Sequence, residues 1–330
     1  MTAPHAHWKG RLRPARTSRG PRLSLAALAI AISWLVSPGF AAQTPGHPIR
    51  GLNNSAALAD AYDAILNAEF HRVDAELAGA CVDVPVWCDV MHAVSVWWQI
   101  ALDPESTRHD RLFSEAVEHA IENAERWTQD EPLRAEAWFA LGAAYGVRAQ
   151  WRVEREERLA AARDGKRIKE ALERALALDS QLHDAKFGIG LYSYYADVAP
   201  AALRWLRWLL VLPGGDRDEG LQQMLDAREH GTVIRGEADY QLHLLYLWYE
   251  ERAEDALMLI HSLQHRYPRN PLFTLIEARI YDVYFHDTDA SAVALRALIA
   301  RALADDVNET SLAIRRARAQ LDRLHARARR

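Results

Sequence analysis

Side chains that could do chemistry are few in this sequence, and none has a catalytic spacing. His261 and His265 lie four residues apart, so both imidazoles would point from one face of a helix and could hold a metal ion. Zinc sites use at least three protein ligands, and no third ligand is spaced nearby. Asp305 and Asp306 are adjacent, which suits the polar end of a helix better than an acid/base pair. We therefore expect exposed histidines, with no metal, no cofactor and no catalytic residue.

The motifs of nucleotide-binding and hydrolytic enzymes are also missing from the sequence. It contains no Gly-x-Gly-x-x-Gly, no phosphate loop, no Gly-x-Ser-x-Gly and no His-Glu-x-x-His. Gly214 and Gly215 could form an anion-binding nest before a helix, but a plain turn is the favoured interpretation. We expect a protein that is not an enzyme. The alternative is an enzyme with a divergent site on a helical scaffold, which a cluster of carboxylates and histidines would favour.

The two cysteines, Cys81 and Cys88, are too few for a disulfide scaffold or a zinc ribbon. They lie seven residues apart and could close a short loop between two helices in an oxidising compartment. Such a closure would add about 2–3 kcal/mol of stability by the chain-entropy relation. Two small reduced side chains in the core are the alternative.

Residues 1–41 have the features of a secretory signal peptide. Six basic residues and no acidic residue precede an apolar run of 14 residues, Leu23 to Val36. Small residues follow, and we predict cleavage after Ala41. The run is short for a membrane-spanning helix, which needs roughly 20 apolar residues. We therefore predict an exported, periplasmic protein. The alternative is a protein anchored to the inner membrane by an uncleaved segment, residues 23–36.

Composition and charge restrict the partners of the remaining chain. Half of the 330 residues are hydrophobic, which excludes wholesale disorder. Without residues 1–41, 34 basic residues face 45 acidic ones, a net charge near −11 that argues against nucleic acid as a partner. The exception is the arginine-rich stretch 306–330, a basic C-terminal helix or tail. We expect it to be a solvated terminal helix, with contact to a membrane or an acidic partner as the alternative.

Apolar residues recur at spacings of three and four from Ser55 onward, which is the pattern of amphipathic helices. Val90, Val94 and Trp97 mark one such face, and Asp103 with the following proline ends that helix. Alternating runs of valine and isoleucine are missing. The sequence therefore predicts an all-α fold without a sheet.

One helical stretch carries a known repeat motif. Trp138, Leu141, Gly142 and Tyr145 have the spacing Trp-x2-Leu-Gly-x2-Tyr, which is typical of the first helix of a tetratricopeptide repeat (TPR). Because Gly142 has no side chain, a neighbouring helix could approach closely there. The three large side chains lie on one helical face and would fill the space around that contact.

Related features recur further along the chain. Tyr246 and Tyr281 are 35 residues apart, close to the 34-residue length of a TPR unit. The chain resembles the TPR family over about residues 110–305, with divergent copies at 55–105. The resemblance implies a right-handed α-solenoid of paired helices at 55–305, after a linker at 42–54. It places the structural repeat positions at Trp138, Leu141, Gly142, Tyr145, Ala175, Gly190, Ala256, Ala278 and Tyr281.

The sequence also departs from the family pattern. Lys186 and Ser193 occupy positions where the family has large apolar residues. The charged stretch from Trp151 to Asp164 lengthens the spacing between two first helices. We therefore expect an irregular superhelix of about five to six helix pairs.

The resemblance further implies a concave groove lined by the first helices of successive pairs. At two of the family's ligand positions Phe139 and Ala143 replace the Lys and Asn that clamp a C-terminal carboxylate, so that clamp is disfavoured. Aromatic rings offer a large contact area, which suits an extended peptide or a partner helix. Packing of these rings between helices is the alternative. The predicted groove residues are Phe139, Phe187, Leu191, Tyr194, Tyr195, Gln241, Trp248 and Tyr249.

One further segment combines tryptophan with arginine. Trp205 and Trp208 lie between Arg204 and Arg207 on one side and leucines on the other, which is a pattern of membrane interfaces. A buried helix is the favoured interpretation, with peripheral membrane contact as the alternative. Taken together, the sequence predicts a non-catalytic protein–protein interaction module of the cell envelope, a TPR-like scaffold or adaptor. A membrane-associated scaffold held by its N-terminus and an enzyme are the alternatives.

Overall fold

The computed structural model describes residues 47–198 and 214–328. Over these ranges the chain is helical and contains no strand, which confirms the all-α prediction. The described residues all belong to one compact unit, His47–Arg330. The expected signal peptide, the alternative anchor at 23–36 and the segment with Trp205 and Trp208 lie outside the described residues.

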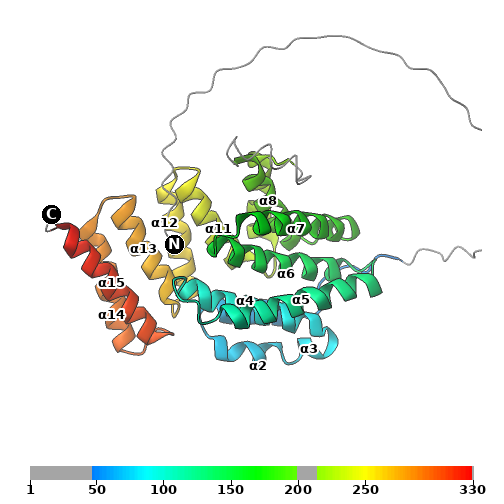
Figure 1. The fold of residues 1–330 in the computed structure, drawn as a ribbon, viewed down its shortest axis with the longest axis horizontal. Coiled ribbons are helices and arrows are strands. Elements are labelled where there is room, and N and C mark those ends of the chain that lie inside the picture. Colours follow the sequence, from blue (N-terminus) through cyan, green and yellow to red (C-terminus); the bar gives the residue numbers. More distant parts are fainter. Residues whose placement is uncertain (1–46, 199–213, 329–330) are drawn as a thin grey trace, which may run out of the picture. The chain divides into compact units, whose positions relative to one another are not determined.

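Apart from the interval between α8 and α10, which includes residues outside the described ranges, the helices follow one another with short connections (Figure 1). They are α1 (Ser55–Leu66), the 3-10 turn η1 (Phe70–Arg72), α2 (Val73–Leu77), α3 (Ala80–Asp83), α4 (Pro85–Leu102), α5 (Asp110–Asp130), α6 (Ala135–Glu154), α7 (Arg158–Leu178), α8 (Asp184–Val198), α10 (Arg217–His230), α11 (Arg235–Trp248), α12 (Ala253–Arg266), α13 (Pro271–Val283), α14 (Thr288–Leu303) and α15 (Thr310–Ala328).

Several helix starts are fixed by side chains that the sequence supplies at the cap position. The carboxylate of Asp216 accepts a hydrogen bond from the backbone N–H of Glu219 at the start of α10 (2.9 Å). Asn270 accepts from Leu272 N–H at the start of α13 (2.9 Å), and Pro271 has no backbone N–H that needs an acceptor. Such caps satisfy backbone donors that have no partner within the helix.

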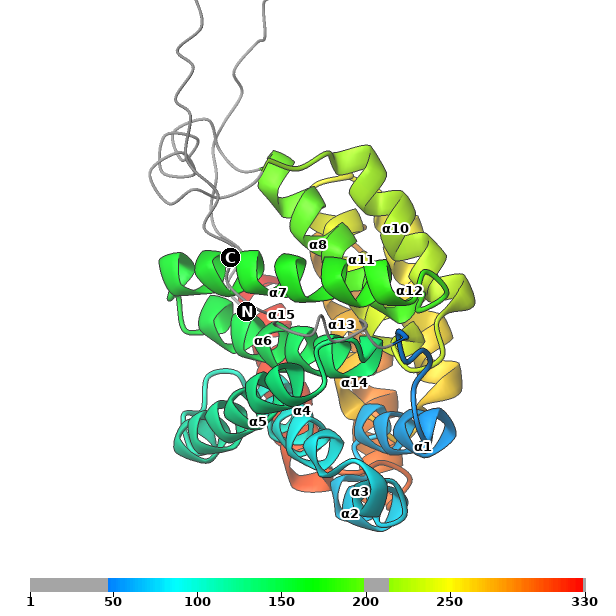
Figure 2. The same ribbon diagram turned by 90° about the vertical axis from the view of Figure 1, so that its right-hand side faces the viewer.

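Helices adjacent in sequence pack against each other. The pairs α4–α5, α6–α7, α8–α10, α11–α12 and α13–α14 are in contact, and α4 and α8 also contact α6. Figures 1 and 2 show α6 beside α7 and α14 beside α15 in both views. The chain thus builds its fold from neighbouring helix hairpins.

Two close helix approaches occur at glycines. A Cβ atom added to Gly142 of α6 would lie 2.4 Å from the Leu172 side chain of α7. A Cβ atom on Gly190 of α8 would lie 2.5 Å from the carbonyl oxygen of Gly220 in α10. At Gly190 the neighbouring atom belongs to the backbone, so a larger residue would force the helices apart, whereas at Gly142 the Leu172 side chain would have to move.

The other expected repeat positions lie in or beside the core. Leu141 and Tyr145 are buried, whereas Trp138 is half-buried and donates its indole N–H to the Pro132 carbonyl (3.0 Å). Tyr281 is half-buried as well. The alanines at Ala175, Ala256 and Ala278 have no exposed surface, so they are small residues at helix contacts.

The charged stretch Trp151 to Asp164 extends two long helices. It covers the end of α6, which has 20 residues, and the start of α7, which has 21. Asp164 is buried and accepts hydrogen bonds from Arg148 (2.8 Å) and Arg152 (2.5 Å). Glu118 of α5 pairs with Arg148 from the other side (2.7 Å). These ion pairs explain how the fold can hold charged side chains at positions where a repeat unit would have apolar residues.

The N-terminal helices cover faces of later helices. Trp98 of α4 packs against Tyr240 of α11, with 4.8 Å between ring centroids, and against Phe273 of α13 at 6.3 Å. Tyr267, after α12, donates a hydrogen bond to Asp63 of α1 (2.6 Å). A single hydrophobic cluster runs from α1 to α15 through these contacts. Segments far apart in sequence therefore share one core.

Both the expected linker and the expected tail contact the helices. Ile49 donates its backbone N–H to Leu133 O and accepts from Ala135 N–H, each at 3.0 Å. At the other end, α15 packs on α13 and α14, and its Leu312 and Leu324 are buried. Hence Ile49 of the expected linker and most of the basic stretch are integrated into the fold.

Among residues 47–198 and 214–328, none of the helices has the length and apolarity needed to cross a membrane.

Candidate functional site

Three tyrosines from the predicted groove meet at the ends of α8 and α11. The rings of Tyr194, Tyr195 and Tyr249 lie 5.8–5.9 Å apart, and each pair is close to perpendicular, at 77–87°. Edge-to-face geometry of this kind adds stability beyond the buried area. The three rings form a rigid group, which we call the tyrosine cluster.

An ion pair holds the tyrosine cluster from one side. Arg217, the first residue of α10, donates from Nε to Glu250 Oε1 (2.8 Å), and the Tyr194 hydroxyl donates to the same carboxylate. The hydrogen bond from Arg217 lowers the pKa of Glu250. Burial, together with the hydrogen bond to Glu250, raises the pKa of Tyr194, so its hydroxyl stays a donor at neutral pH. The cluster is thereby pre-ordered by side chains from α8, α10 and the residues after α11.

Beside the cluster lies a patch of exposed apolar side chains. Trp248 and Tyr249, at the end of α11, are 40% and 42% exposed. Val283, at the end of α13, is 41% exposed, and the half-buried Tyr284 that follows it lies close to Trp248. We call these four residues the aromatic surface. It is a place where large rings face solvent on a pre-ordered base.

The remaining predicted groove residues have no such exposure. Phe139 is buried and packs on Trp87 of α4, 5.6 Å between ring centroids. Phe187 is buried, and Leu191 is half-buried against the same hydrophobic cluster. Gln241 is buried and donates to Glu237 (2.8 Å) and Gln150 (3.0 Å). These side chains contact other helices of the chain, and Phe187 and Leu191 share a hydrophobic cluster with Tyr194.

A buried polar network surrounds Glu237 of α11, and no motif or spacing in the sequence indicates it. The Glu237 carboxylate accepts from the hydroxyl of Tyr62 (2.8 Å) and from the amides of Gln150 (3.1 Å) and Gln241 (2.8 Å). Burial raises the pKa of Glu237. Three helices, α1, α6 and α11, are joined through this one carboxyl group, and it has no solvent access for a reaction.

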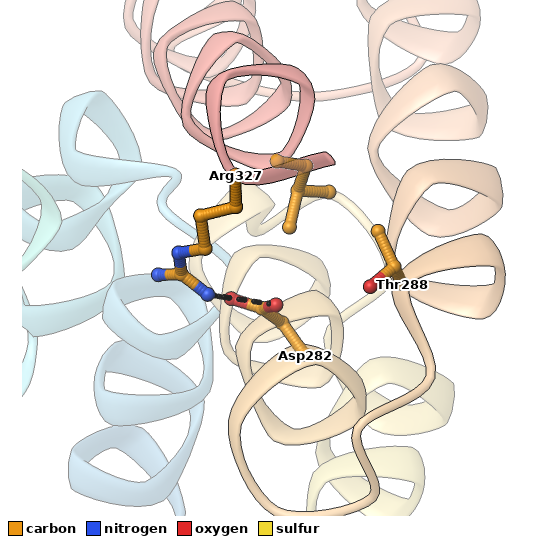
Figure 3. A pocket seen from close by; sticks show the side chains of 4 residues that line it. Asp282, Thr288 and Arg327 are labelled. Carbon is orange, nitrogen blue, oxygen red and sulfur yellow. Dashed lines mark hydrogen bonds and ion pairs between the residues drawn. The ribbon is translucent and has the colours of Figure 1, made fainter. Parts of the chain in front are cut away.

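The tail occupies a shallow pocket at the end of α13. Asp282, Thr288, Leu324 and Arg327 line a space of about 230 Å³. In Figure 3, Arg327 extends from α15 to Asp282 of α13, and its guanidinium is 2.8 Å from the carboxylate. The ion pair joins α15 to α13 at this pocket.

A second pocket lies beside the paired cysteines. Cys81 and Cys88 are joined as a disulfide, with their Cα atoms 5.7 Å apart. The neighbouring space of about 400 Å³ is lined by Asp83, Asp89, Asp130 and Glu131, and by Arg126 and Arg134 among others. Within this lining, Arg134 forms an ion pair with Glu131 at 3.3 Å.

The structure also assembles a cluster that sequence spacing did not reveal. Among the described residues, His183, Asp226 and His230 are the one group of metal-ligating side chains that converge, with their ligand atoms all within 4.8 Å of one another. The histidine pair considered from the sequence has a different environment, since His261 pairs with Glu277 (3.1 Å). The four-residue spacing of Asp226 and His230 is a sequence feature that could have indicated this cluster. His183 could not be added from spacing, because it lies 43 positions before Asp226.

No family model matches this chain. A search of curated proteins also finds no match.

Proposed function

We propose that this protein is a non-catalytic interaction module, a TPR-like scaffold or adaptor that binds an apolar peptide segment or a partner helix. The observation that carries the proposal is the aromatic surface, where Trp248 and Tyr249 expose rings on the ordered tyrosine cluster. Exposed, conformationally fixed aromatic residues are the usual energetic centres of protein interfaces. A rigid base reduces the entropy lost when a partner binds.

The proposed binding mode differs from occupation of a groove along the first helices. Phe139 and Gln241 contact α4, α6 and other parts of the same chain, so those positions serve the core. The binding surface is instead placed at the ends of α11 and α13. A partner would cover Trp248, Tyr249 and Val283 with its own apolar side chains, and each one buried would contribute roughly 1.5–3 kcal/mol before ordering costs.

The TPR-like arrangement is part of the same proposal. Its support is the contact of sequential helix pairs, together with the contacts of α4 and α8 with α6. The close approach at Gly142 is what the repeat motif requires of that glycine. We also propose that the protein is exported to the periplasm. The support is the basic and apolar N-terminal pattern with the disulfide between Cys81 and Cys88.

A capture experiment tests the binding surface. Purified protein is immobilised and exposed to an envelope extract, and retained proteins are quantified for wild type and for a Trp248→Ala/Tyr249→Ala variant. A Met258→Ala/Val293→Ala variant is the matched control, because both side chains are 62% exposed apolar residues on α12 and α14. For at least one partner that the control retains, we expect the Trp248→Ala/Tyr249→Ala variant to retain at least about tenfold less protein. Equal recovery of every protein by all three, with equal thermal stability, would contradict the proposal.

A further inference from the structure

His183, Asp226 and His230 converge at the end of the α8–α10 pair distant from the tyrosine cluster, and we call them the His–Asp–His cluster. His183 is the residue before α8, and Asp226 and His230 belong to the last two turns of α10. Their ligand atoms lie within 4.8 Å of one another. No part of the interaction proposed above uses these side chains.

The backbone explains why the three side chains meet. Asp226 and His230 are four residues apart on α10 and therefore share a helical face. The close approach of Gly190 and Gly220 brings α8 against α10. His183 then extends from the start of α8 to the end of α10. The cluster is thus positioned by two helices and not by a long loop, which suits a site of fixed geometry.

The donor atoms and their separations fit a transition-metal ion. His183 Nδ1 is 2.8 Å from Asp226 Oδ2, and His230 Nδ1 is 3.3 Å from Asp226 Oδ1. Ligands bound to zinc at about 2.0–2.2 Å in a tetrahedron are separated by roughly 3.3 Å. The two imidazole rings are 5.2 Å apart between centroids. His230 Nδ1 is also 3.2 Å from the Asp226 carbonyl oxygen, to which it donates while it carries a proton. To bind a metal ion, Nδ1 must give up this hydrogen bond, and the proton must lie on Nε2.

We propose that the His–Asp–His cluster binds one divalent transition-metal ion, with Zn²⁺ as the best-fitting ion. Two histidines and one carboxylate are the protein ligands of many zinc sites that keep an open fourth position. The side chains are 24%, 32% and 51% exposed, in the order His183, Asp226, His230, so solvent can reach the cluster and supply a water as fourth ligand. Ca²⁺ and Mg²⁺ prefer oxygen ligands, so a site with two imidazoles does not suit them.

The ammonium group of Lys186 would compete with a metal ion for the Asp226 carboxylate. Its ammonium lies 2.8 Å from Asp226 Oδ2 and 3.3 Å from His183 Nδ1, so a positive charge already occupies the place where a cation is attracted. Lys186 is also a position at which the sequence departs from the TPR pattern. A metal ion must displace this ammonium, and the flexible side chain, 28% exposed, can move toward solvent. Removal of the lysine should therefore tighten metal binding.

The test measures Zn²⁺ binding to the untagged full chain by competition with a chromophoric chelator, and Co²⁺ binding by its visible absorption. The variants are His183→Ala, Asp226→Asn, His230→Ala and Lys186→Met, with His261→Ala/His265→Ala as the control pair. We expect one Zn²⁺ per chain for wild type and the control. Each ligand variant should bind at least about tenfold more weakly, and Lys186→Met at least about tenfold more tightly.

Thermal unfolding supplies an independent readout. Zn²⁺ should raise the melting temperature of wild type and of Lys186→Met, but not that of His230→Ala, whose exposed side chain can be removed without disturbing the core. The proposal is overturned if wild type binds no Zn²⁺, or if its affinity is unchanged in His230→Ala. Loss of binding in the His261/His265 control would also overturn it, because it would place the ion elsewhere.

Discussion

Gly190 and Gly220 face each other across the α8–α10 contact with no side chain between them. A Cβ atom on Gly220 would lie 2.6 Å from the carbonyl oxygen of Gly190 and 2.7 Å from the backbone nitrogen of Tyr194. These are backbone atoms, so they cannot rotate away as the end of a side chain can. The contact fixes the spacing of the helices that carry both the tyrosine cluster and the His–Asp–His cluster.

Gly220→Ala should therefore destabilise the protein by about 1–3 kcal/mol, the usual cost of overpacking. Gly146 is the matched control, because it lies inside α6 and an added Cβ atom meets nothing within 4 Å. Gly146→Ala should stabilise by about 0.5–1 kcal/mol through helix propensity. Urea unfolding of both variants checks the pair. Similar effects of the two substitutions would contradict the backbone contact.

Glu237 offers a test of the buried polar network. Glu237→Leu removes the acceptor of Tyr62, Gln150 and Gln241, and each buried donor left unpaired should cost about 1–3 kcal/mol. Glu237→Gln keeps an acceptor oxygen and nearly the same shape, so it should be far milder. The two variants are compared by their free energies of unfolding in urea, and equal destabilisation would argue against the network.

The raised pKa of Glu237 also predicts how Glu237→Gln compares with wild type as the pH changes. In the folded state the protonated carboxyl is favoured, so the unfolded chain releases its proton first, near the ordinary pKa of 4.5. Wild type therefore loses stability from this residue as the pH rises from 4.5 through its folded-state pKa. The glutamine variant lacks this loss. Its stability relative to wild type should rise over that window, as measured by urea unfolding at several pH values.

His243 should make the protein sensitive to acid. The side chain is buried in α11 and donates to the Tyr240 carbonyl, and burial lowers its pKa from 6.5 to about 3. Between these values the unfolded chain binds the proton and the folded chain does not. Stability from this residue is therefore complete above pH 6.5 and falls by up to about 1.4 kcal/mol per pH unit toward pH 3.

The check compares wild type with His243→Leu, which fills a similar volume without titrating. The free energy of unfolding of wild type should fall more steeply than that of the variant as the pH decreases from 6.5. Parallel pH profiles would contradict the prediction, because they would show that His243 has the same pKa in the folded and unfolded states.

The disulfide between Cys81 and Cys88 should stabilise the N-terminal helices. For so short a loop the chain-entropy relation gives about 2.5 kcal/mol. Cys81→Ser/Cys88→Ser should be less stable than oxidised wild type by that amount, and the two proteins should become similar in a reducing buffer. Equal stability without reductant, with thiol titration confirming that wild type is oxidised, would contradict a stabilising role.

Local features of the fold were accessible from the sequence. The spacing of apolar residues predicted helices and no sheet, and the described residues agree. Gly142 was predicted to allow a close helix approach, and Leu172 of α7 lies against it. Both predictions rest on residues within one helix or one hairpin, where chain connectivity restricts the neighbours.

Long-range packing was not accessible in the same way. Phe139 and Tyr249 have the same aromatic character and were both assigned to a groove, yet Phe139 is covered by Trp87 while Tyr249 is 42% exposed. Which of them is covered depends on where α4 lies relative to α6, and no local pattern encodes that. The His–Asp–His cluster is similar, because His183 meets Asp226 only through the packing of α8 on α10.

The final helix has a neighbour from the start of the fold. Arg316 of α15 donates to the carbonyl of Leu102 at the end of α4, 214 positions earlier, and Arg315 pairs with Asp103 at 2.6 Å. In an open repeat array, terminal units fray first, because each has only one adjoining unit. Here the last helix is held from two directions, so the chain should melt as one cooperative block instead of unravelling from its C-terminal end.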